Sequence, residues 1–216
     1  MTDLAYHLQE LEIHRHPDDP RHVMPRLPAH FSSVLDIGCG IGQTLITADV
    51  PRDALAVGID LDYEALAYGR KLSAGTGFVK ATGEKLPFAA ESFDVVYSRV
   101  ALPWMHIPSA LAEVFRVAKP GAYVWFSLVR FSDAIRQTTA ALKALKPKNV
   151  LYRSYVLVNG IWFHATAKQF RFPLRRARCE SFQTTRGMMK AMSMIGFQDI
   201  RVEREQFFVV TARKPA

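Results

Sequence analysis

Three glycines alternate with other residues in a short run, at Gly38, Gly40 and Gly42, directly after an apolar stretch that ends at Ile37. Glycine is needed where the main chain turns sharply and lets a ligand touch the backbone. A second apolar stretch ends at Asp60, whose carboxylate could accept hydrogen bonds from the two hydroxyls of a ribose. The combination indicates a binding site for a nucleotide-like ligand.

Asp36 narrows the choice of ligand, because it stands two residues before the first glycine. In a dinucleotide-binding fold, which uses the same glycine turn, a carboxylate here would point at the pyrophosphate and repel it. S-adenosylmethionine carries an ammonium and a sulfonium group and no phosphate, so a nearby carboxylate favours its binding. The alternative is that Asp36 caps a turn and the glycines serve packing, which would require several signals to coincide.

The elements that would position these residues alternate between strand and helix from Ser33 onward. Short apolar runs predict five strands, over residues 33–38, 54–60, 78–81, 93–98 and 122–129. Helical spacing of apolar residues predicts helices over residues 4–13, 63–72 and 108–117, and a short one through Leu45. Repeated strand–helix units of this size form a parallel sheet with helices on both faces.

The chain ends on a different pattern, a helix over residues 185–194 followed by two strands, 197–203 and 206–212. The tight connection between these strands favours an antiparallel pair at the sheet edge. The predicted fold is therefore α/β, a Rossmann-like, mainly parallel sheet of seven strands with an antiparallel last strand.

About fifty residues between the fifth strand and the last helix do not fit the repeat and form an insertion. We expect a helix over residues 132–145 and then short extended pieces. The apolar residues 156–158 and 161–163 suit a lid over a lipophilic pocket. Between Arg130 and Lys190 there are 13 lysines and arginines but two acidic residues, a net charge of +11, whereas the whole chain has +8. The basicity is thus a local feature of the insertion.

Four blocks of sequence resemble the class I S-adenosylmethionine-dependent methyltransferases, and among them the methyltransferase type 11 group. The blocks are residues 34–42, 58–60, 83–88 (Gly-Glu-Lys-Leu-Pro-Phe), and 93–98 followed by 113–121. The resemblance runs from about Ser33 to Val129 and continues more faintly through residues 187–213. It implies an enzyme of class EC 2.1.1 with S-adenosyl-L-methionine as its cofactor.

The resemblance also implies where the cofactor lies. The implied contacts are Asp36, Gly38, Cys39 and Gly40 at the methionine end, Asp60 at the ribose, Leu61, Thr82, Gly83 and Glu84 at the adenine, and the main chain of Ser98 beside the reacting methyl group. At the position of Thr82 the family often has an acidic residue that reads the adenine amino group. A threonine accepts that hydrogen bond more weakly.

The segments expected from these patterns are four. They are an N-terminal helix and lid segment (1–30), the cofactor-binding core (31–130), the basic, aromatic-rich insertion as a substrate cap (131–182), and a C-terminal helix and hairpin that complete the core (183–216). In the family the N-terminal region often folds over the cofactor, so Tyr6 or His7 would touch it. His14 and His16 lack the spacing of a metal site, and no metal is expected.

The acceptor is expected near residues 99–106, where the sequence departs from the family's frequent Leu-His-His-type pattern. His106 could be a general base, or a helix-start residue with no catalytic part. Arg99 could pair with an anionic acceptor, or form a structural salt bridge. Trp104 could be an aromatic wall of the acceptor pocket, or part of the core.

The favoured function is methyl transfer to an O, N or C nucleophile of a small acceptor, anionic or lipophilic. The alternative is an RNA methyltransferase that uses the arginines and interleaved aromatics of the insertion. A third hypothesis, a non-catalytic cofactor-binding protein, ranks last because the motifs are intact. The start of the chain lacks a secretory pattern and no apolar run is long enough for a membrane span, so we expect a cytoplasmic protein with Cys39 and Cys179 reduced.

Overall fold

The computed structural model describes residues 3–143, 147–173 and 179–216, and its centre is one seven-stranded sheet. The strands are β1 (Ser33–Ile37), β2 (Leu55–Asp60), β3 (Thr76–Lys80), β4 (Phe93–Arg99), β5 (Ala118–Leu128), β6 (Gln198–Glu203) and β7 (Phe208–Arg213). Their order is β3-β2-β1-β4-β5-β7-β6, and β7 runs antiparallel to both of its neighbours. The predicted fold is confirmed.

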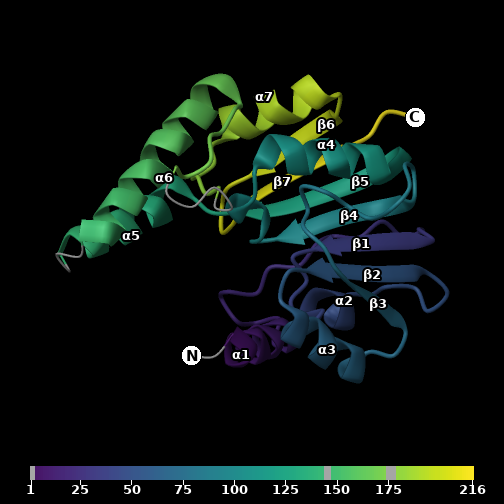
Figure 1. Cartoon of the computed structure of the whole chain (residues 1–216). Coiled ribbons are helices and arrows are strands. Elements are labelled where there is room, and N and C mark those ends of the chain that lie inside the picture. The colour runs from purple at the N-terminus through teal and green to yellow at the C-terminus, as the bar shows by residue number, and fades with distance from the viewer. Residues whose placement is uncertain (1–2, 144–146, 174–178) are drawn as a thin grey trace.

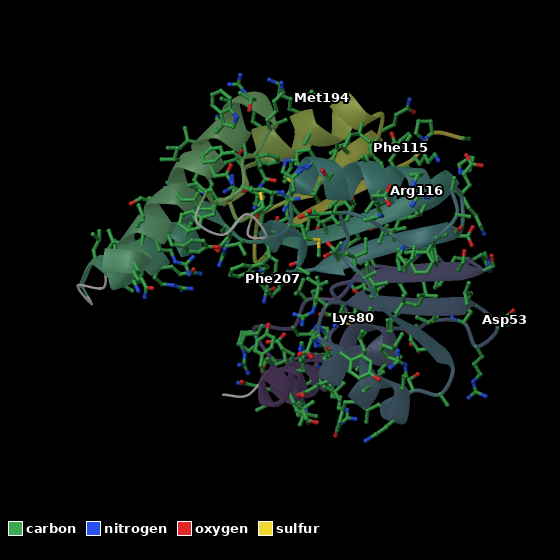
Figure 2. The ribbon with its side chains drawn as sticks, in the orientation of Figure 1. Asp53, Lys80, Phe115, Arg116, Met194 and Phe207 are labelled. Carbon is green, nitrogen blue, oxygen red and sulfur yellow. The ribbon has the colours of Figure 1, made fainter. Side chains whose placement is uncertain are left out.

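Two layers of helices cover the sheet (Figure 1). The helices are α1 (Asp3–Arg15), α2 (Gln43–Thr47), α3 (Tyr63–Leu72), the 3-10 turn η1 (Leu102–Trp104), α4 (Ile107–Val117), α5 (Phe131–Lys143), α6 (Pro147–Thr166) and α7 (Thr185–Ile195). Helices α4 and α7 lie together on one face, and α1 packs on α2 and α3. Among the labelled residues of Figure 2, Phe115 of α4 and Met194 of α7 mark the first face.

The core forms where the predicted apolar faces meet. All five residues of β1 are buried, as a central parallel strand covered on both faces requires. Helix α4 buries Leu111, Val114 and Val117 against the sheet, and each such side chain stabilises the fold by about 1.5–3 kcal/mol. The rings of Phe115 and Phe197 meet edge to face, 5.0 Å apart, and join α4 to the segment before β6.

The parallel strands β1, β2 and β4 end at one edge of the sheet, where the glycine run, Asp60 and Arg99 come together. Helix α1 and the hairpin of α5 and α6 flank this edge (Figure 1). Asp53 precedes β2 and Phe207 precedes β7, and Figure 2 shows these two residues at opposite ends of the sheet. This is expected because β7 runs antiparallel to the central strands.

Two local predictions are wrong. The part of the insertion expected to hold short extended pieces forms the long helix α6, because Tyr155, Asn159 and Phe163 recur every four residues and bury one side of a helix. The strand expected over residues 122–129 begins earlier, because β5 starts at Ala118 directly after α4 and pairs irregularly with β4 there. The helix expected over residues 132–145 is confirmed as α5, within the described residues.

Candidate functional site

The glycine run forms the loop between β1 and α2, and its backbone is fixed against the end of β2. The amides of Gly38 and Cys39 both donate to the carbonyl of Ile59, at 2.8 and 2.9 Å. Gly38 has φ of 79°, and a Cβ atom built on it would lie 2.1 Å from the Cβ of Ala101. Only glycine fits this position, because it lets Ala101 pack directly against the backbone of the loop.

The carboxylate of Asp60 is held by hydrogen bonds from backbone amides, one of them in the glycine loop. Its Oδ2 accepts from the amide of Gly40 at 2.8 Å, and its Oδ1 accepts from the amide of Asp62 at 2.9 Å. Each carboxylate oxygen accepts more than one hydrogen bond, so both can still accept from ribose hydroxyls. The two hydrogen bonds thereby fix the orientation of the side chain.

Asp36 is almost fully buried in β1, and its Oδ1 has no hydrogen-bond partner. Burial raises the pKa of this carboxyl to about 8, and the charge of Asp60 adds to the shift. Arg99 and the hydroxyl of Tyr97 act in the opposite direction, although that hydroxyl does not complete a hydrogen bond with Oδ1. A cationic group beside Asp36 would favour the charged carboxylate.

Other buried polar atoms near this loop also lack partners. They are Nδ1 of His7, Oε1 of Gln43 and the hydroxyl oxygen of Tyr97. A Cβ atom on Gly40 would lie 2.4 Å from the His7 ring and 3.1 Å from Oε1 of Gln43, which places both side chains directly at the loop. Unpaired buried polar groups are costly, so this cluster fits the polar methionine end of S-adenosylmethionine.

Arg99, at the end of β4, contacts helix α1 and not an open pocket. Its guanidinium nitrogen lies 2.6 Å from Oε2 of Glu10, and the two side chains are 9% and 16% exposed. The structure thus shows the salt bridge that the sequence left as an alternative. Ser98 beside it is buried, and its hydroxyl donates to the carbonyl of Ile37 at 2.8 Å, which fixes the β4 main chain against β1.

The predicted adenine side lies in the loop after β3. The Thr82 hydroxyl accepts from the amide of Glu84 at 3.3 Å, and Gly83 is packed so closely that an added Cβ would lie 2.7 Å from the sulfur of Met105. Leu61 is exposed at the tip of β2, where an adenine ring could cover it. Oε1 of Glu84 accepts from the backbone amide of His106 at 2.6 Å.

Comparison with known proteins agrees with this geometry. Residues 35–126 match the family model described as a methyltransferase domain. A malonyl-[acyl-carrier protein] O-methyltransferase of Enterobacter lignolyticus is 32% identical over 146 residues, 66% of this chain and 56% of that protein. A cycloartenol-C-24-methyltransferase of Arabidopsis thaliana is 36% identical over 105 residues, 43% of this chain and 31% of that protein. Residues 35–126 thus match a methyltransferase domain, and the chain spans about half the length of the curated relatives that it matches.

The solved structures give the same fold. One is described as an S-adenosylmethionine-dependent methyltransferase of Thermotoga maritima, with a TM-score of 0.65, 19% identity, and coverage of 98% of this chain and 95% of that one. The human N-acetylserotonin methyltransferase, solved with S-adenosylmethionine, has a TM-score of 0.56 and 15% identity over 86% of this chain and 48% of that one. S-adenosylmethionine is the cofactor of this family.

On the acceptor side of the methyltransferase domain, His106 and Trp104 lie before α4. Nδ1 of His106 is 2.8 Å from the hydroxyl of Ser109, and burial lowers the pKa of the ring, so it is neutral at pH 7. Trp104 is 53% exposed and therefore not a core residue. It lines a small hollow with Ala134 of α5, Val156 of α6 and Phe182.

The insertion contacts the start of α4 and the loop after β3 through Gln169 and Arg171, which the sequence analysis did not predict to make these contacts. Oε1 of Gln169 accepts from the amide of Ile107 at 2.6 Å, and Arg171 pairs with Oε2 of Glu84. Four aromatic side chains pack on one another as a small core, namely Tyr152, Tyr155, Phe170 and Phe172. Arg175, Arg176 and Arg178 lie outside the described residues.

A hollow of about 830 Å³ lies elsewhere, on the sheet over Tyr123, Trp125 and Val209. It is wide open and mixed in charge, with Arg204 and Glu203 at its rim. None of the predicted site residues lines it. The glycine loop therefore remains the candidate site, because four unpaired buried polar atoms lie near it and none belongs to a residue that lines the larger hollow.

Proposed function

We propose that this chain transfers a methyl group from S-adenosylmethionine to an O, N or C nucleophile of a small acceptor. The observation that carries the proposal is the buried carboxyl of Asp36, whose Oδ1 lacks a hydrogen-bond partner, beside the glycine loop, with Asp60 fixed at the neighbouring strand end. The chain spans 56% and 40% of the length of the first two curated relatives that it matches, so the activity of the whole protein is part of this proposal.

The residues divide the binding task. Asp36 faces the ammonium group, and Asp60 receives the ribose hydroxyls while its own hydrogen bond to Gly40 keeps the loop in shape. The loop of Gly83 and Glu84 meets the adenine edge. When bound, the cofactor supplies a methyl group that is already activated on a sulfonium, so positioning and exclusion of water supply most of the acceleration.

The acceptor is proposed to enter beside Trp104, between η1, α5 and α6. His106 is neutral at pH 7 and can take a proton from a hydroxyl or ammonium acceptor, although an acceptor that is already deprotonated needs no base. Relatives of this chain include a malonyl-[acyl-carrier protein] O-methyltransferase and a sterol 24-C-methyltransferase, which supports a small or carrier-linked acceptor. The +11 net charge of residues 130–190 favours RNA as the second candidate.

The molecule that receives the methyl group distinguishes methyl transfer to a small acceptor from methyl transfer to RNA. When native protein is incubated with S-adenosylmethionine labelled in the methyl group and with a bacterial metabolite, lipid and RNA extract, label is expected in the small-molecule or lipid fraction. Asp60→Ala protein should give none. Label in RNA would favour the second candidate, and label in no fraction would contradict the proposed activity.

Arg99 is proposed to act through Asp36 and α1 and not on the acceptor. Arg99→Met should weaken S-adenosylmethionine binding about tenfold, because the nearest positive charge that lowers the pKa of Asp36 is lost together with the ion pair to Glu10. When S-adenosylmethionine binding is titrated over a pH series, the affinity of Arg99→Met protein should reach half of its maximum at a higher pH than that of the native chain. Arg99→Lys should restore the native pH profile in large part, whereas a purely structural role would leave that profile unchanged in both variants.

A further inference from the structure

The side chains of α6 that face solvent between residues 151 and 165 are all uncharged, and most are apolar. They are Leu151, Ser154, Val158, Ile161, Trp162 and Ala165, and they are called the outer face of α6 below. The four large ones are 50–62% exposed. Spacings of three, four and seven place them on one side of the helix, along about 20 Å.

The opposite side of α6 is occupied already. Tyr155, Val156 and Phe163 are buried there against the rest of the insertion and the domain. A helix that is apolar on both sides is expected to be covered on both. In Figure 1, α6 runs along the outer margin of the molecule, and the described residues cover its inner side only.

Positive charge borders the outer face. From Pro147 to Lys190 the sequence has nine lysines and arginines and one acidic residue, Glu180. Glu180 is buried and pairs with Arg153 at 3.0 Å. Lys168 is exposed just beyond the end of α6, and Lys190 of α7 donates to the carbonyl of Ala165 at 2.9 Å.

We propose that the outer face of α6 docks onto the surface of a membrane that contains anionic lipids. Its apolar side chains would enter the boundary between headgroups and acyl chains, while the bordering lysines meet the negative headgroups. A second copy of the chain would place like charges against one another, and RNA would leave the apolar side chains uncovered. No helix among the described residues could cross a membrane, so the contact is with the surface.

The docking has a consequence that rests on the proposed function. The inner side of α6 contributes Val156 to the hollow beside Trp104, so a lipophilic acceptor in the membrane would lie one helix away from the site. The docking itself does not require methyl transfer, and its test is therefore independent of catalysis.

Flotation of the full chain with vesicles tests the proposal. The protein should bind vesicles of phosphatidylcholine mixed with phosphatidylglycerol, should bind those of phosphatidylcholine alone much more weakly, and should be released at about 1 M salt. Trp162→Ser should weaken binding roughly tenfold, through the lost apolar burial. Lys168→Gln should weaken it about fivefold, the effect of one basic residue near the surface.

Leu55→Ser is the matched control, since Leu55 is 58% exposed at the start of β2, remote from α6. It should bind vesicles as the native chain does, and all variants should bind S-adenosylmethionine with native affinity. Equal binding to both vesicle types, or an equal loss in Leu55→Ser, would overturn the proposal. A failure to bind vesicles would also overturn the proposal. The outer face of α6 would then join two copies of the chain, which light scattering would detect, or bind RNA or an acidic protein.

Discussion

Replacing Asp36 with asparagine is expected to weaken S-adenosylmethionine binding about 100-fold and, at pH 8, to raise the melting temperature of the cofactor-free chain by roughly 2–4 °C. The loss of affinity follows because asparagine offers no negative charge to the ammonium group. The gain in stability follows because the native carboxyl is buried without a partner for its Oδ1.

The stability effect has a defined pH window. The pKa of Asp36 is about 8 in the folded chain, against about 3.9 for an aspartate in an unfolded one. Between these values the folded chain holds a proton that the unfolded chain has lost, so the free energy of unfolding falls as the pH rises. The difference between native and Asp36→Asn protein should therefore grow from pH 4 to pH 8 and vanish below pH 4.

Melting temperatures of both proteins across this range, with titration calorimetry at each pH, measure the two effects together. In the native chain the affinity should rise with pH up to about 8, because binding requires the charged carboxylate. Asp53→Asn, at an exposed position, is the control and should change neither quantity. A variant that binds as tightly as the native chain would remove Asp36 from the cofactor site.

Replacing Asp60 with alanine is expected to reduce S-adenosylmethionine affinity roughly 1000-fold, through loss of two charge-assisted hydrogen bonds to the ribose. It should also lower the free energy of unfolding by about 1–3 kcal/mol, since the amides of Gly40 and Asp62 lose their acceptor. Titration calorimetry and urea denaturation measure the two effects.

Asp62→Ala separates the ligand contact from local stability. Asp62 caps α3 by accepting from the amides of Glu64 and Ala65, so its loss should cost about 1 kcal/mol of stability. It makes no contact with the glycine loop through its side chain in the described structure, and cofactor binding should stay close to native. Equal losses of affinity in the Asp60 and Asp62 variants would show that the effect comes from disruption of the loop.

The sequence was sufficient to propose a cofactor side because the signals for it are local. A glycine turn after a buried strand and a carboxylate at the next strand tip lie within a few residues of the elements that position them. The hydrogen bond from Gly40 to Asp60 could not be predicted, because it depends on how the two strand ends meet in space. The same holds for the pair of Arg99 and Glu10, which are 89 residues apart.

The insertion was predicted less well because its pattern is ambiguous. The apolar residues of α6 lie on both its inner side and its outer face, so the helical period is weak and the sequence did not indicate one long helix there. The sequence located the excess of positive charge but not its placement around an exposed apolar face. That arrangement is a property of the folded helix and its neighbour α7.

The central claim is that the glycine loop binds a methyl donor and not a dinucleotide, and it can be tested on the native chain by titration calorimetry with S-adenosylmethionine and with NAD. We expect one S-adenosylmethionine site per chain, abolished by Asp60→Ala. With NAD we expect no heat of binding at about pH 9, where the carboxylate of Asp36 is charged and repels the pyrophosphate. Binding of NAD, or the absence of S-adenosylmethionine binding in the folded native chain, would contradict the account.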